Sequence, residues 1–318
     1  MKTPAIMLNT LAALVPGTLA FCWFFGAGVL LNILIATAAA VIAEALALRL
    51  RDRSLASLRD GSIILTGALL GLCLPPLLPG WMVLLGAVAA VVFGKQVYGG
   101  TGQNVFNPAM VGYCVLILSF PLAMSQWPDS GNTASWQATL DAKLTMGGYP
   151  AYDGLTAATP LDSYRFREGQ TNQEFFAGEL GNGENWQRWA TVNLAFLVGG
   201  AYLLYRRIIP WQTPAAMLGT LGLLSLLFYA GGSSDSLGSP VFHLLGGATM
   251  LGAFFIITDP VTCPGYPRAL LCFGAGIGLV TFIIRSIGAY PEGLAFSVLL
   301  LNACAPMLDH LFTRRAPA

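Results

Sequence analysis

A short polar stretch, DGLTAATPLD at residues 153–162, places two threonine hydroxyls among small and acidic residues. Thr156 and Thr159 are separated by two alanines, and the stretch lies in a hydrophilic interval between strongly apolar sequences. A hydroxyl group can donate and accept hydrogen bonds and can be modified covalently. Threonine, aspartate and glycine are also common turn residues, so a turn is the default interpretation when these residues are considered alone.

The glycine-rich stretch VYGGTGQNVFNPAMVG, residues 97–112, is a second candidate for ligand binding. Its glycines allow the backbone to approach a flat or bulky ligand, and the side chains of Asn104 and Asn107 offer amide donors and acceptors. An equally good interpretation is a tight re-entrant turn, with Asn107 capping a helix that begins at Pro108. The stretch matches neither a Walker loop nor a dinucleotide-binding fingerprint, because no GK[ST] follows the glycines and no strand precedes them.

Two carboxylates in apolar surroundings, Asp259 and Asp309, are candidates for a cation path. A charge at bilayer depth is costly unless it is neutralised, paired or hydrated. Asp259 lies in the TDP interruption of an apolar run, and Asp309 follows Pro306, which frees backbone carbonyl groups. The alternative is that Asp259 caps the chain before its proline and that Asp309 pairs with His310 or a terminal arginine.

The composition indicates that a membrane protein must position these residues. Of the 318 residues, 55% are hydrophobic and 10% are charged, whereas soluble proteins carry about 25% charged residues. The six cysteines lie mostly in apolar runs without CxxC or Cys/His spacing, so we expect neither disulfides nor a metal site. We also expect no nucleic-acid partner and no catalytic side chain in the chain itself.

Hydrophobic runs of about 20 residues predict membrane-spanning helices. The chain contains ten candidate spans, several of them short or interrupted, and the first is interpreted as a span and not as a removable leader. The candidate spans are residues 7–25, 28–48, 60–76, 80–96, 107–124, 189–205, 213–230, 240–257, 268–284 and 293–312.

The distribution of basic residues predicts the orientation of these spans. Arginines and lysines cluster after the second, fourth and sixth spans, before the ninth span and at the end of the chain. The positive-inside rule therefore places both termini in the cytoplasm and the polar loop of residues 127–188 in the periplasm.

Five spans on each side of this loop are typical of an inverted repeat. We therefore expect an all-α polytopic membrane protein of about ten transmembrane helices, some of them broken. The expected divisions are a first five-helix repeat at residues 1–126, the periplasmic loop at 127–188, and a second repeat at 189–318.

Five motifs in a fixed order give the chain a family resemblance: LRDGSIILTGALLGLCLPP, FGKQVYGGTGQNVFNPAMVGY, DGLTAATPLD, TDPVTCPGYPR and NACAPMLDH. Together they resemble the RnfD/NqrB family of membrane subunits, which belong to the bacterial Rnf complex and the sodium-pumping NADH:quinone oxidoreductase. The similarity is greatest to the RnfD branch and covers essentially the whole chain. It implies a fold similar to that of urea transporters.

The resemblance implies a covalent flavin in the periplasmic loop. In this family the last threonine of an [ST]-G-A-T motif carries FMN through a phosphoester bond, and the matching residue of TAAT here is Thr159. Asp153 and Thr156 then belong to the recognition motif. Ala157 stands where the family usually has glycine, which leaves the acceptor hydroxyl intact. An exposed hydroxyl among small residues suits the active site of a separate flavin transferase.

The resemblance also implies a noncovalent riboflavin among the helices. We place it toward the cytoplasmic side near Gly99 and Gly100, with Asn104 and Asn107 close by. A flavin near each face of the membrane would let electrons cross it within this one subunit.

The function implied by the resemblance is that of a translocase subunit in the bacterial inner membrane. Such a chain passes electrons between ferredoxin and NAD(H), couples this to ion transport, and is inactive alone. Its expected partners are the other Rnf subunits, including a periplasmic FMN-carrying subunit and iron–sulfur membrane subunits. Two alternatives are a solute or ion transporter without a redox cofactor and a structural subunit that anchors redox partners.

Overall fold

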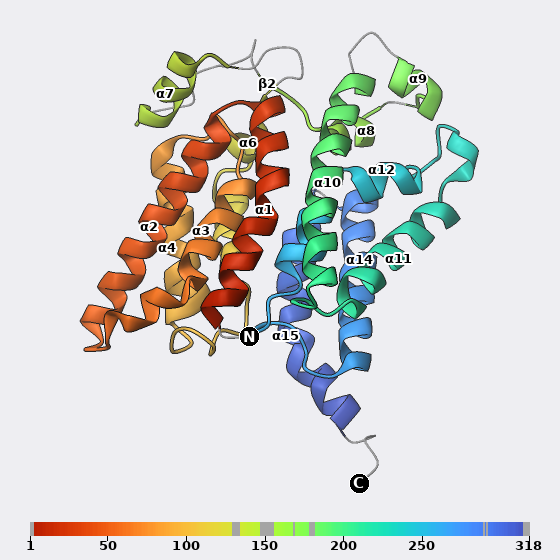
Figure 1. The fold of residues 1–318 in the computed structure, drawn as a ribbon. Coiled ribbons are helices and arrows are strands. Elements are labelled where there is room, and N and C mark those ends of the chain that lie inside the picture. Colours follow the sequence, from red (N-terminus) through yellow and green to blue (C-terminus); the bar gives the residue numbers. More distant parts are fainter. Residues whose placement is uncertain are drawn as a thin grey trace. The chain divides into compact units, whose positions relative to one another are not determined.

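The structure is a computed structural model that describes residues 3–128, 134–146, 156–167, 169–177, 182–288, 290 and 292–313. The chain forms two compact units, Met1–Ala158 and Thr159–Ala318, which are called unit 1 and unit 2 below. Helices dominate both units (Figure 1), and the described strands are limited to β1 (Trp127–Pro128) and β2 (Thr156–Ala157), which pair antiparallel. The prediction of an all-α protein is therefore confirmed.

Long apolar helices confirm that the chain is a multi-pass membrane protein. Four described helices are long and apolar enough to cross a bilayer: α1 (Thr3–Phe25), α2 (Gly28–Leu50), α14 (Pro267–Ile287) and α15 (Leu294–Thr313). Several other expected spans contain shorter apolar helices, and the run at 240–257 is divided between short helices. The ten-helix inverted repeat and the three-part division of the chain stay predictions.

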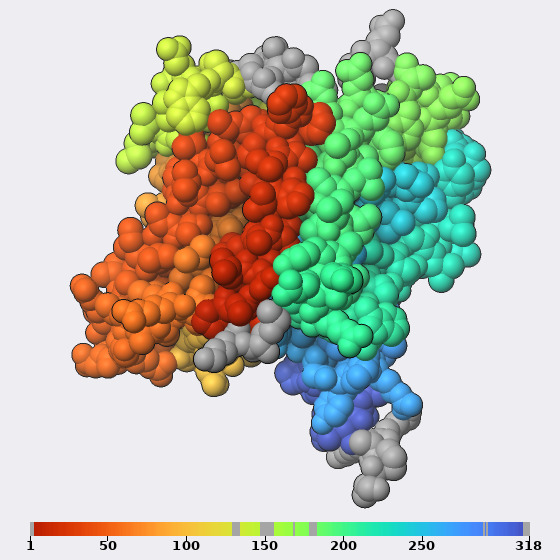
Figure 2. Space-filling model, viewed as in Figure 1, coloured from red at the N-terminus to blue at the C-terminus, as the bar shows by residue number. Residues whose placement is uncertain are grey.

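Apolar side chains on the outer face of α2 suit contact with lipid. Leu30, Leu34, Ile42 and Leu46 are each more than two-fifths exposed, and their spacing places them on one side of the helix. The helix belongs to the red and orange surface of Figure 2. A soluble protein rarely exposes such a continuous apolar stripe, whereas a bilayer covers it.

Unit 1 is built around α2. This helix packs against α3 (Ser62–Cys73) and α4 (Gly80–Val91), and α4 packs against α5 (Pro108–Ser119). The long helix α1 packs against α2 and α3. Besides β1 and β2, the other elements of unit 1 are short: η1 (Leu55–Asp60), the π-helical turn η2 (Val92–Gln96), α6 (Pro121–Ser125) and α7 (Trp136–Leu144).

Glycines allow α2 and α3 to approach closely. A Cβ atom on Gly67 would lie 2.4 Å from the Cα of Thr37, and one on Gly71 would lie 2.6 Å from the Cα of Ile33. Small residues four positions apart are typical of tightly packed membrane helices, because the backbones themselves make the contact.

Unit 2 contains α10 (Asn182–Tyr205), α11 (Gln212–Leu227), α14 and α15, together with several short helices. The short elements are α8 (Pro160–Arg165), α9 (Asn172–Ala177), η3 (Ala230–Gly232), α12 (Pro240–Leu245), α13 (Thr249–Leu251) and the π-helical turn η4 (Gly252–Ile256). α11 packs extensively against α14, where Cβ atoms on Gly274 and Gly278 would lie 2.3 Å and 2.5 Å from carbonyl oxygens of α11.

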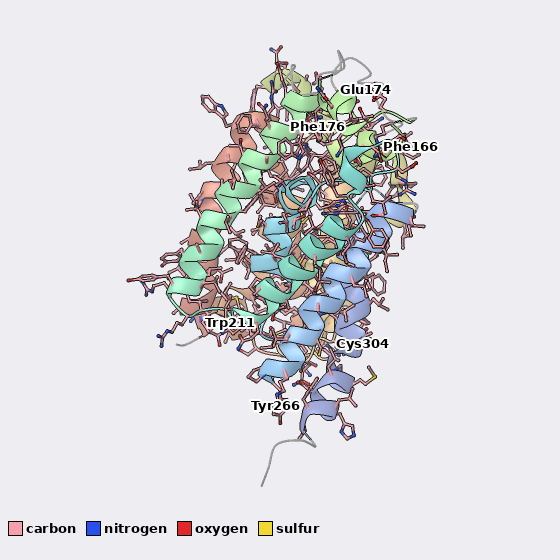
Figure 3. The ribbon with its side chains drawn as sticks, turned by 90° about the vertical axis from the view of Figure 1, so that its right-hand side faces the viewer. Phe166, Glu174, Phe176, Trp211, Tyr266 and Cys304 are labelled. Atoms are coloured by element: carbon pink, nitrogen blue, oxygen red, sulfur yellow. The ribbon has the colours of Figure 1, made fainter. Side chains whose placement is uncertain are left out.

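Figure 3 shows how the long helices of unit 2 separate its two ends. Phe166, Glu174 and Phe176 lie at one end, and Trp211 and Tyr266 lie toward the other. Trp211 and Tyr266 are exposed aromatic residues next to helix ends, which is where amphipathic rings meet a membrane–water interface.

Both units contain a junction between two helices whose backbone is bound by a buried asparagine. In unit 1, Asn32 on α2 donates to the carbonyl oxygens of Leu74 and Pro75 between α3 and α4. In unit 2, Asn193 on α10 donates to the carbonyl oxygens of Leu245, the last residue of α12, and of Gly247, between α12 and α13. In each unit the second helical piece ends in a π-helical turn, so the two halves share a structural device.

Candidate functional site

Thr159 begins unit 2 as the N-cap of α8. Its hydroxyl oxygen accepts a hydrogen bond from the backbone N–H of Asp162 at 3.3 Å, and the residue is partly exposed. Pro160 occupies the first helical position, where its missing N–H has no cost and its fixed φ favours the helix. The local sequence TPLD therefore holds the hydroxyl at a defined helix start.

The electrostatics at this helix start involve Asp162 and Arg165. Burial raises the pKa of the Asp162 carboxyl, and the Arg165 guanidinium opposes that shift. Arg165 also donates to the carbonyl oxygens of Ile287 and Tyr290 at 3.4 Å and 3.5 Å, which ties α8 to the end of α14.

Thr156 has a different environment from Thr159. It lies in β2 opposite Pro128 of β1, and the neighbouring Trp127 stacks on Phe21 of α1 with ring centroids 6.0 Å apart. Asp153, the other expected member of the recognition motif, lies outside the described residues. The two threonines are thus a strand residue in unit 1 and a helix cap in unit 2.

An aromatic cluster fixes α8 within unit 2. The buried members of the cluster are Leu161, Tyr164, Phe175 and Phe242. The guanidinium of Arg167 lies 3.9 Å from the centre of the Tyr164 ring and donates to the backbone oxygen of Ser236. Burial of these rings against α12 holds the short helix that follows Thr159 in one position.

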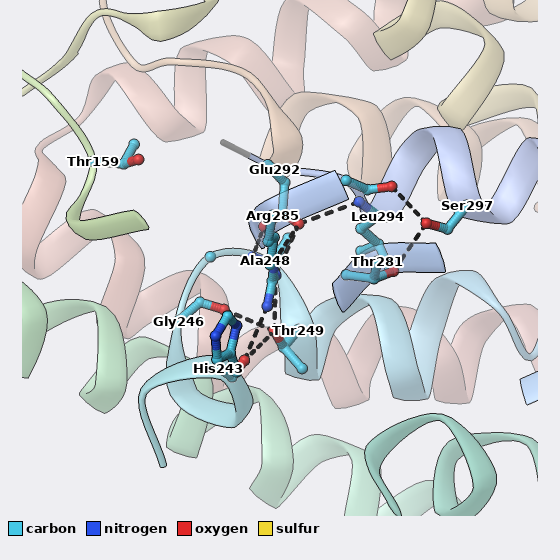
Figure 4. A network of polar contacts seen from close by, with 12 residues as sticks. Thr159, His243, Gly246, Ala248, Thr249, Thr281, Arg285, Glu292, Leu294 and Ser297 are labelled. Carbon is cyan, nitrogen blue, oxygen red and sulfur yellow. Dashed lines mark hydrogen bonds and ion pairs between the residues drawn. The ribbon is translucent and has the colours of Figure 1, made fainter. Parts of the chain in front are cut away.

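Figure 4 shows a polar network centred on Arg285 in the same unit. Its Nη2 atom lies 2.8 Å and 2.9 Å from the two carboxylate oxygens of Glu292 and 3.0 Å from the hydroxyl of Thr249. Its Nη1 atom donates to the carbonyl oxygen of His243 at 3.0 Å. Glu292 also accepts the backbone N–H of Ala248 at 2.9 Å, so the network closes the break between α12 and α13.

The network was not predicted from the sequence. Arg285 is buried inside α14 and Glu292 precedes α15, and the pair is bidentate, a geometry in which Arg binds carboxylates strongly. A basic residue seven positions before an acidic one, at the junction of two apolar runs, is the sequence signal that could have revealed it. Thr159 lies apart from this network in Figure 4.

The glycine-rich stretch forms a hydrogen-bonded turn in unit 1. Gly99 and Gly100 have φ angles of +118° and +105°, which residues with a Cβ rarely adopt. The N–H of Gly100 donates to the Lys95 carbonyl at 3.1 Å, and Arg53 donates to the Gly99 carbonyl. The glycines are therefore required by the backbone conformation itself.

The two asparagines of this stretch have structural contacts. Asn107 caps α5 by accepting the Met110 N–H at 3.3 Å, and Pro108 is the first helical residue, which confirms that part of the turn interpretation. Asn104 donates to the Phe106 carbonyl at 3.2 Å. Tyr98, which was not among the predicted site residues, lies edge-on to Phe106 with ring centroids 6.1 Å apart and is partly exposed.

A buried ion pair lies beneath this turn. The ammonium of Lys95, in η2, lies 2.8 Å from a carboxylate oxygen of Glu44 on α2 and donates to the Ser62 hydroxyl at 3.0 Å. Gln96 also donates to Glu44, at 3.3 Å. π-helical turns are frequent at functional sites, and this one turns Lys95 and Gln96 toward α2.

Asp259 and Asp309 both bind the loop that precedes α14. Asp259 accepts from the Val261 N–H at 3.1 Å, and Asp309 accepts from the Gly265 N–H at 2.9 Å. Burial raises the pKa of Cys263 in this loop to about 12, and the negative charges of both aspartates act in the same direction. The structure therefore brings the two carboxylates to one loop, where both stabilise backbone N–H groups.

A metal site within the residues that the structure describes would require a group of side chains that could bind a metal ion. No three or more His, Cys, Asp or Glu side chains are grouped there so that they could hold a metal ion.

A model of the NQR2, RnfD, RnfE family matches residues 1–317. The chain belongs to this family. A relative from Pseudomonas aeruginosa (strain LESB58), named as the D subunit of an ion-translocating oxidoreductase complex, is 47% identical over 320 residues, covering 98% of this chain and 91% of the relative. A protein of the same name from Escherichia coli O1:K1 / APEC is 46% identical over 334 residues, covering 98% of this chain and 93% of the relative.

Membership of the NQR2, RnfD, RnfE family confirms the resemblance that the ordered motifs gave. In this member, the expected site residues are divided between the two units. Gly99, Gly100, Asn104 and Asn107 lie in unit 1, whereas Thr159, Asp259 and Asp309 lie in unit 2.

Proposed function

We propose that this chain is the D-type subunit of an Rnf-type ion-translocating oxidoreductase complex in the bacterial inner membrane. It carries FMN through a phosphoester bond on Thr159 and binds riboflavin noncovalently near Gly99 and Gly100. Electrons pass through it between ferredoxin and NAD(H), coupled to ion transport. The names of relatives that are 46–47% identical over almost the whole chain support the assignment to the complex.

The position of Thr159 is the observation that carries the flavin assignment. A phosphoester would replace the proton of its hydroxyl, while the oxygen could still accept the Asp162 N–H that it accepts now. A helix start favours a nearby anion, since its N–H groups and dipole present partial positive charge. Partial exposure leaves the hydroxyl open to a flavin transferase, so the residues present fit the group.

The surroundings of Gly99 and Gly100 also fit a flat ligand. A Cβ on Gly99 would meet only the Gln103 side chain, at 3.5 Å, and the partly exposed Tyr98 ring offers a face on which a flavin can stack. A bound flavin supplies the electron-transfer chemistry, and the protein supplies its position and excludes water.

The remaining functions of the complex belong to partner subunits in this proposal. The partners include a periplasmic FMN-carrying subunit and iron–sulfur membrane subunits. Both termini of this chain lie in the cytoplasm, and residues 127–188 lie in the periplasm.

Asp259 and Asp309 form part of an ion path from the loop before α14, where their charges lie near Cys263. We expect complexes assembled with Asp259→Asn or Asp309→Asn to retain flavin but to generate no membrane potential. A normal membrane potential would show that both carboxylates only cap backbone N–H groups.

Fluorescence of the denatured chain on a gel tests the covalent flavin. Wild type and Thr156→Ala are expected to fluoresce under ultraviolet light, and Thr159→Ala is expected to be dark at equal protein load. Thr159→Ser, which keeps a hydroxyl, should retain part of the signal. A fluorescent Thr159→Ala chain would overturn the assignment.

A further inference from the structure

The break between α3 and α4 in unit 1 gathers neutral oxygen atoms around a buried position. Asn32, which is fully buried on α2, uses its amide nitrogen to bind the carbonyl oxygens of Leu74 and Pro75 at 3.2 Å and 2.9 Å. Its amide oxygen is then free to face a donor or a cation. The carbonyl of Leu78 points to the same place, because both oxygens bind one common partner.

That partner is the ammonium group of Lys143, in the last turn of α7. Its Nζ atom lies 2.5 Å from the Asn32 amide oxygen and 2.6 Å from the Leu78 carbonyl oxygen, and the lysine is buried. A lysine from a polar loop helix therefore reaches into the break of an apolar helix. Asn32 and Lys143 are 111 residues apart in the chain, so this contact defines the tertiary structure of unit 1.

Lys143 differs from the other buried cations of the chain. Lys95 pairs with Glu44, and Arg285 pairs with Glu292. Among the residues that the structure describes, no carboxylate forms an ion pair with Lys143. The oxygens that the described residues offer to its ammonium group are an amide oxygen and a carbonyl oxygen, and both are uncharged.

Broken helices in membrane transport proteins bind alkali cations with this kind of ligand. Unwound carbonyl groups and the carboxyl-terminal ends of half-helices carry partial negative charge and replace the hydration shell of a monovalent ion. The Leu74 and Pro75 carbonyls follow the end of α3 and accept from the Asn32 amide nitrogen, so the Asn32 amide links the negative end of this helix to the Lys143 ammonium.

The approach of α7 to the break depends on Gly80, the first residue of α4. A Cβ atom on Gly80 would lie 2.8 Å from the backbone oxygen of Lys143, so a larger residue would push α7 away. The glycine therefore permits the contact that inserts the ammonium. The lysine can also lose its charge at neutral pH, since burial lowers the pKa of Lys143 to about 7.

We propose that the Asn32 amide oxygen and the Leu78 carbonyl oxygen form the core of a binding site for a monovalent alkali cation, which the tethered ammonium of Lys143 occupies in this structure. Lys143 and a free Na⁺ or K⁺ then compete for the same oxygens. The site goes beyond the flavin assignments and does not rest on them.

Binding of radioactive Na⁺ to the full-length chain in detergent tests the site, with thermal unfolding in parallel. At pH 6, where Lys143 is charged, Lys143→Ala should bind Na⁺ or K⁺ about tenfold or more tightly than wild type, because the competing cation is gone. Its unfolding midpoint should rise in NaCl or KCl, compared with choline chloride at equal ionic strength. The proposal would be overturned if Lys143→Ala bound neither Na⁺ nor K⁺ more tightly than wild type and if neither NaCl nor KCl raised its unfolding midpoint.

A salt comparison and one further variant keep the test decisive. If Lys143→Ala unfolds in choline chloride, recovery of the folded chain in NaCl or KCl supports the site. If the variant does not fold in any of the three salts, Lys143 has a structural role only and the proposal is contradicted. Asn32→Leu in the Lys143→Ala background removes the amide oxygen, so the gain in cation affinity should disappear. An unchanged gain would place the bound ion elsewhere and contradict the proposal.

Discussion

At Thr159 one hydroxyl oxygen has two roles, helix capping and flavin attachment, and substitution can separate them. The cap is a single hydrogen bond to Asp162 at the start of a six-residue helix. Replacing a capping threonine by alanine costs about 1 kcal/mol. Loss of flavin from Thr159→Ala therefore reports chemistry at the oxygen and not unfolding of unit 2.

Thr159→Asp provides a matched control for this separation. Aspartate caps helices as well as threonine does but has no hydroxyl to esterify. We expect the free energy of unfolding of Thr159→Asp to lie within about 1 kcal/mol of that of the wild-type chain made without the flavin transferase, and we expect the variant to carry no covalent flavin. Thermal unfolding and the flavin absorbance of the denatured chain measure the two quantities. Covalent flavin on the aspartate variant would show that another residue is the acceptor.

Lys143 makes the stability of the protein depend on pH in a defined direction. Its pKa is about 7 in the folded chain and 10.5 in its ordinary state, so between these values the unfolded chain binds more protons. Stability should therefore rise with pH from about 7 to 10.5, with a slope of at most about 1.4 kcal/mol per pH unit.

Comparison of wild type with Lys143→Met isolates this contribution. We expect the unfolding midpoint of wild type to increase from pH 7 to pH 9.5 relative to that of the variant, in a buffer series of constant ionic strength. Parallel pH curves for the two chains would show that Lys143 is not the titrating group.

Sequence reasoning proposed Thr159 as a site residue but did not draw attention to Lys143 or to the Arg285 network, for a physical reason. Thr159 belongs to a contiguous motif whose chemistry is local. Lys143 acquires its meaning only from Asn32, 111 residues earlier, and Arg285 from the helix break beside it. Burial of a cation is a tertiary property, and a lysine in a polar loop carries no local sign of it.

At the scale of elements, close glycine contacts set the packing of α2 against α3 and of α11 against α14. Gly278 of α14 faces the Met217 carbonyl of α11, where a Cβ atom would lie 2.5 Å away. Gly219 is also helical but has no atom within 4 Å of the corresponding position. The two glycines therefore form a matched pair for substitution.

We expect Gly278→Ala to destabilise the chain by about 1–3 kcal/mol through overpacking. Gly219→Ala should be neutral or stabilising by up to about 1 kcal/mol, because alanine restricts the unfolded chain. Chemical unfolding in detergent measures both. Equal effects of the two substitutions would remove the role assigned to the α11–α14 contact.

The buried Glu44–Lys95 pair links α2 to the π-helical turn η2. Lys95→Met alone leaves Glu44 buried without its cation and should cost about 3–5 kcal/mol. The double variant Glu44→Gln with Lys95→Met removes both charges and should recover most of that loss. Unfolding of the three chains at pH 7 provides the comparison, and a double variant as unstable as Lys95→Met would contradict the pairing.

The type of element was predictable from the sequence, and the continuity of the helices was less so. Apolar runs indicated helices, and Pro108 with Asn107 indicated the start of α5, as the structure confirms. The run at 60–76 contains only the twelve-residue α3, because Pro75 and Pro76 cannot continue a helix. Hydropathy counts apolar residues and does not register where the backbone leaves the helix.

At the scale of the whole molecule, each unit has a junction between two helices whose backbone an asparagine binds. In each unit the helix after the junction ends in a π-helical turn. Asn32 and Asn193 are the two asparagines. This likeness is consistent with internal repetition, which places irregular backbone where protein surrounds it. The inverted orientation of the halves stays a prediction from the positive-inside rule.

Division of labour within the complex predicts the behaviour of the isolated chain. Purified alone, it should show flavin absorbance but no NADH oxidation, because the sites for NADH and iron–sulfur clusters are assigned to partner subunits. Spectrophotometry with NADH and an artificial electron acceptor measures this. Robust turnover by the isolated chain would overturn the proposed division.

Fragmentation mass spectrometry of one tryptic peptide tests the central claim most directly. Cleavage after Lys143 and Arg165 releases residues 144–165, which contain both Thr156 and Thr159. In chain purified from cells that assemble the complex, we predict that this peptide carries FMN and that the fragments assign its phosphate to the Thr159 oxygen. An unmodified peptide, or FMN on Thr156, would contradict the account.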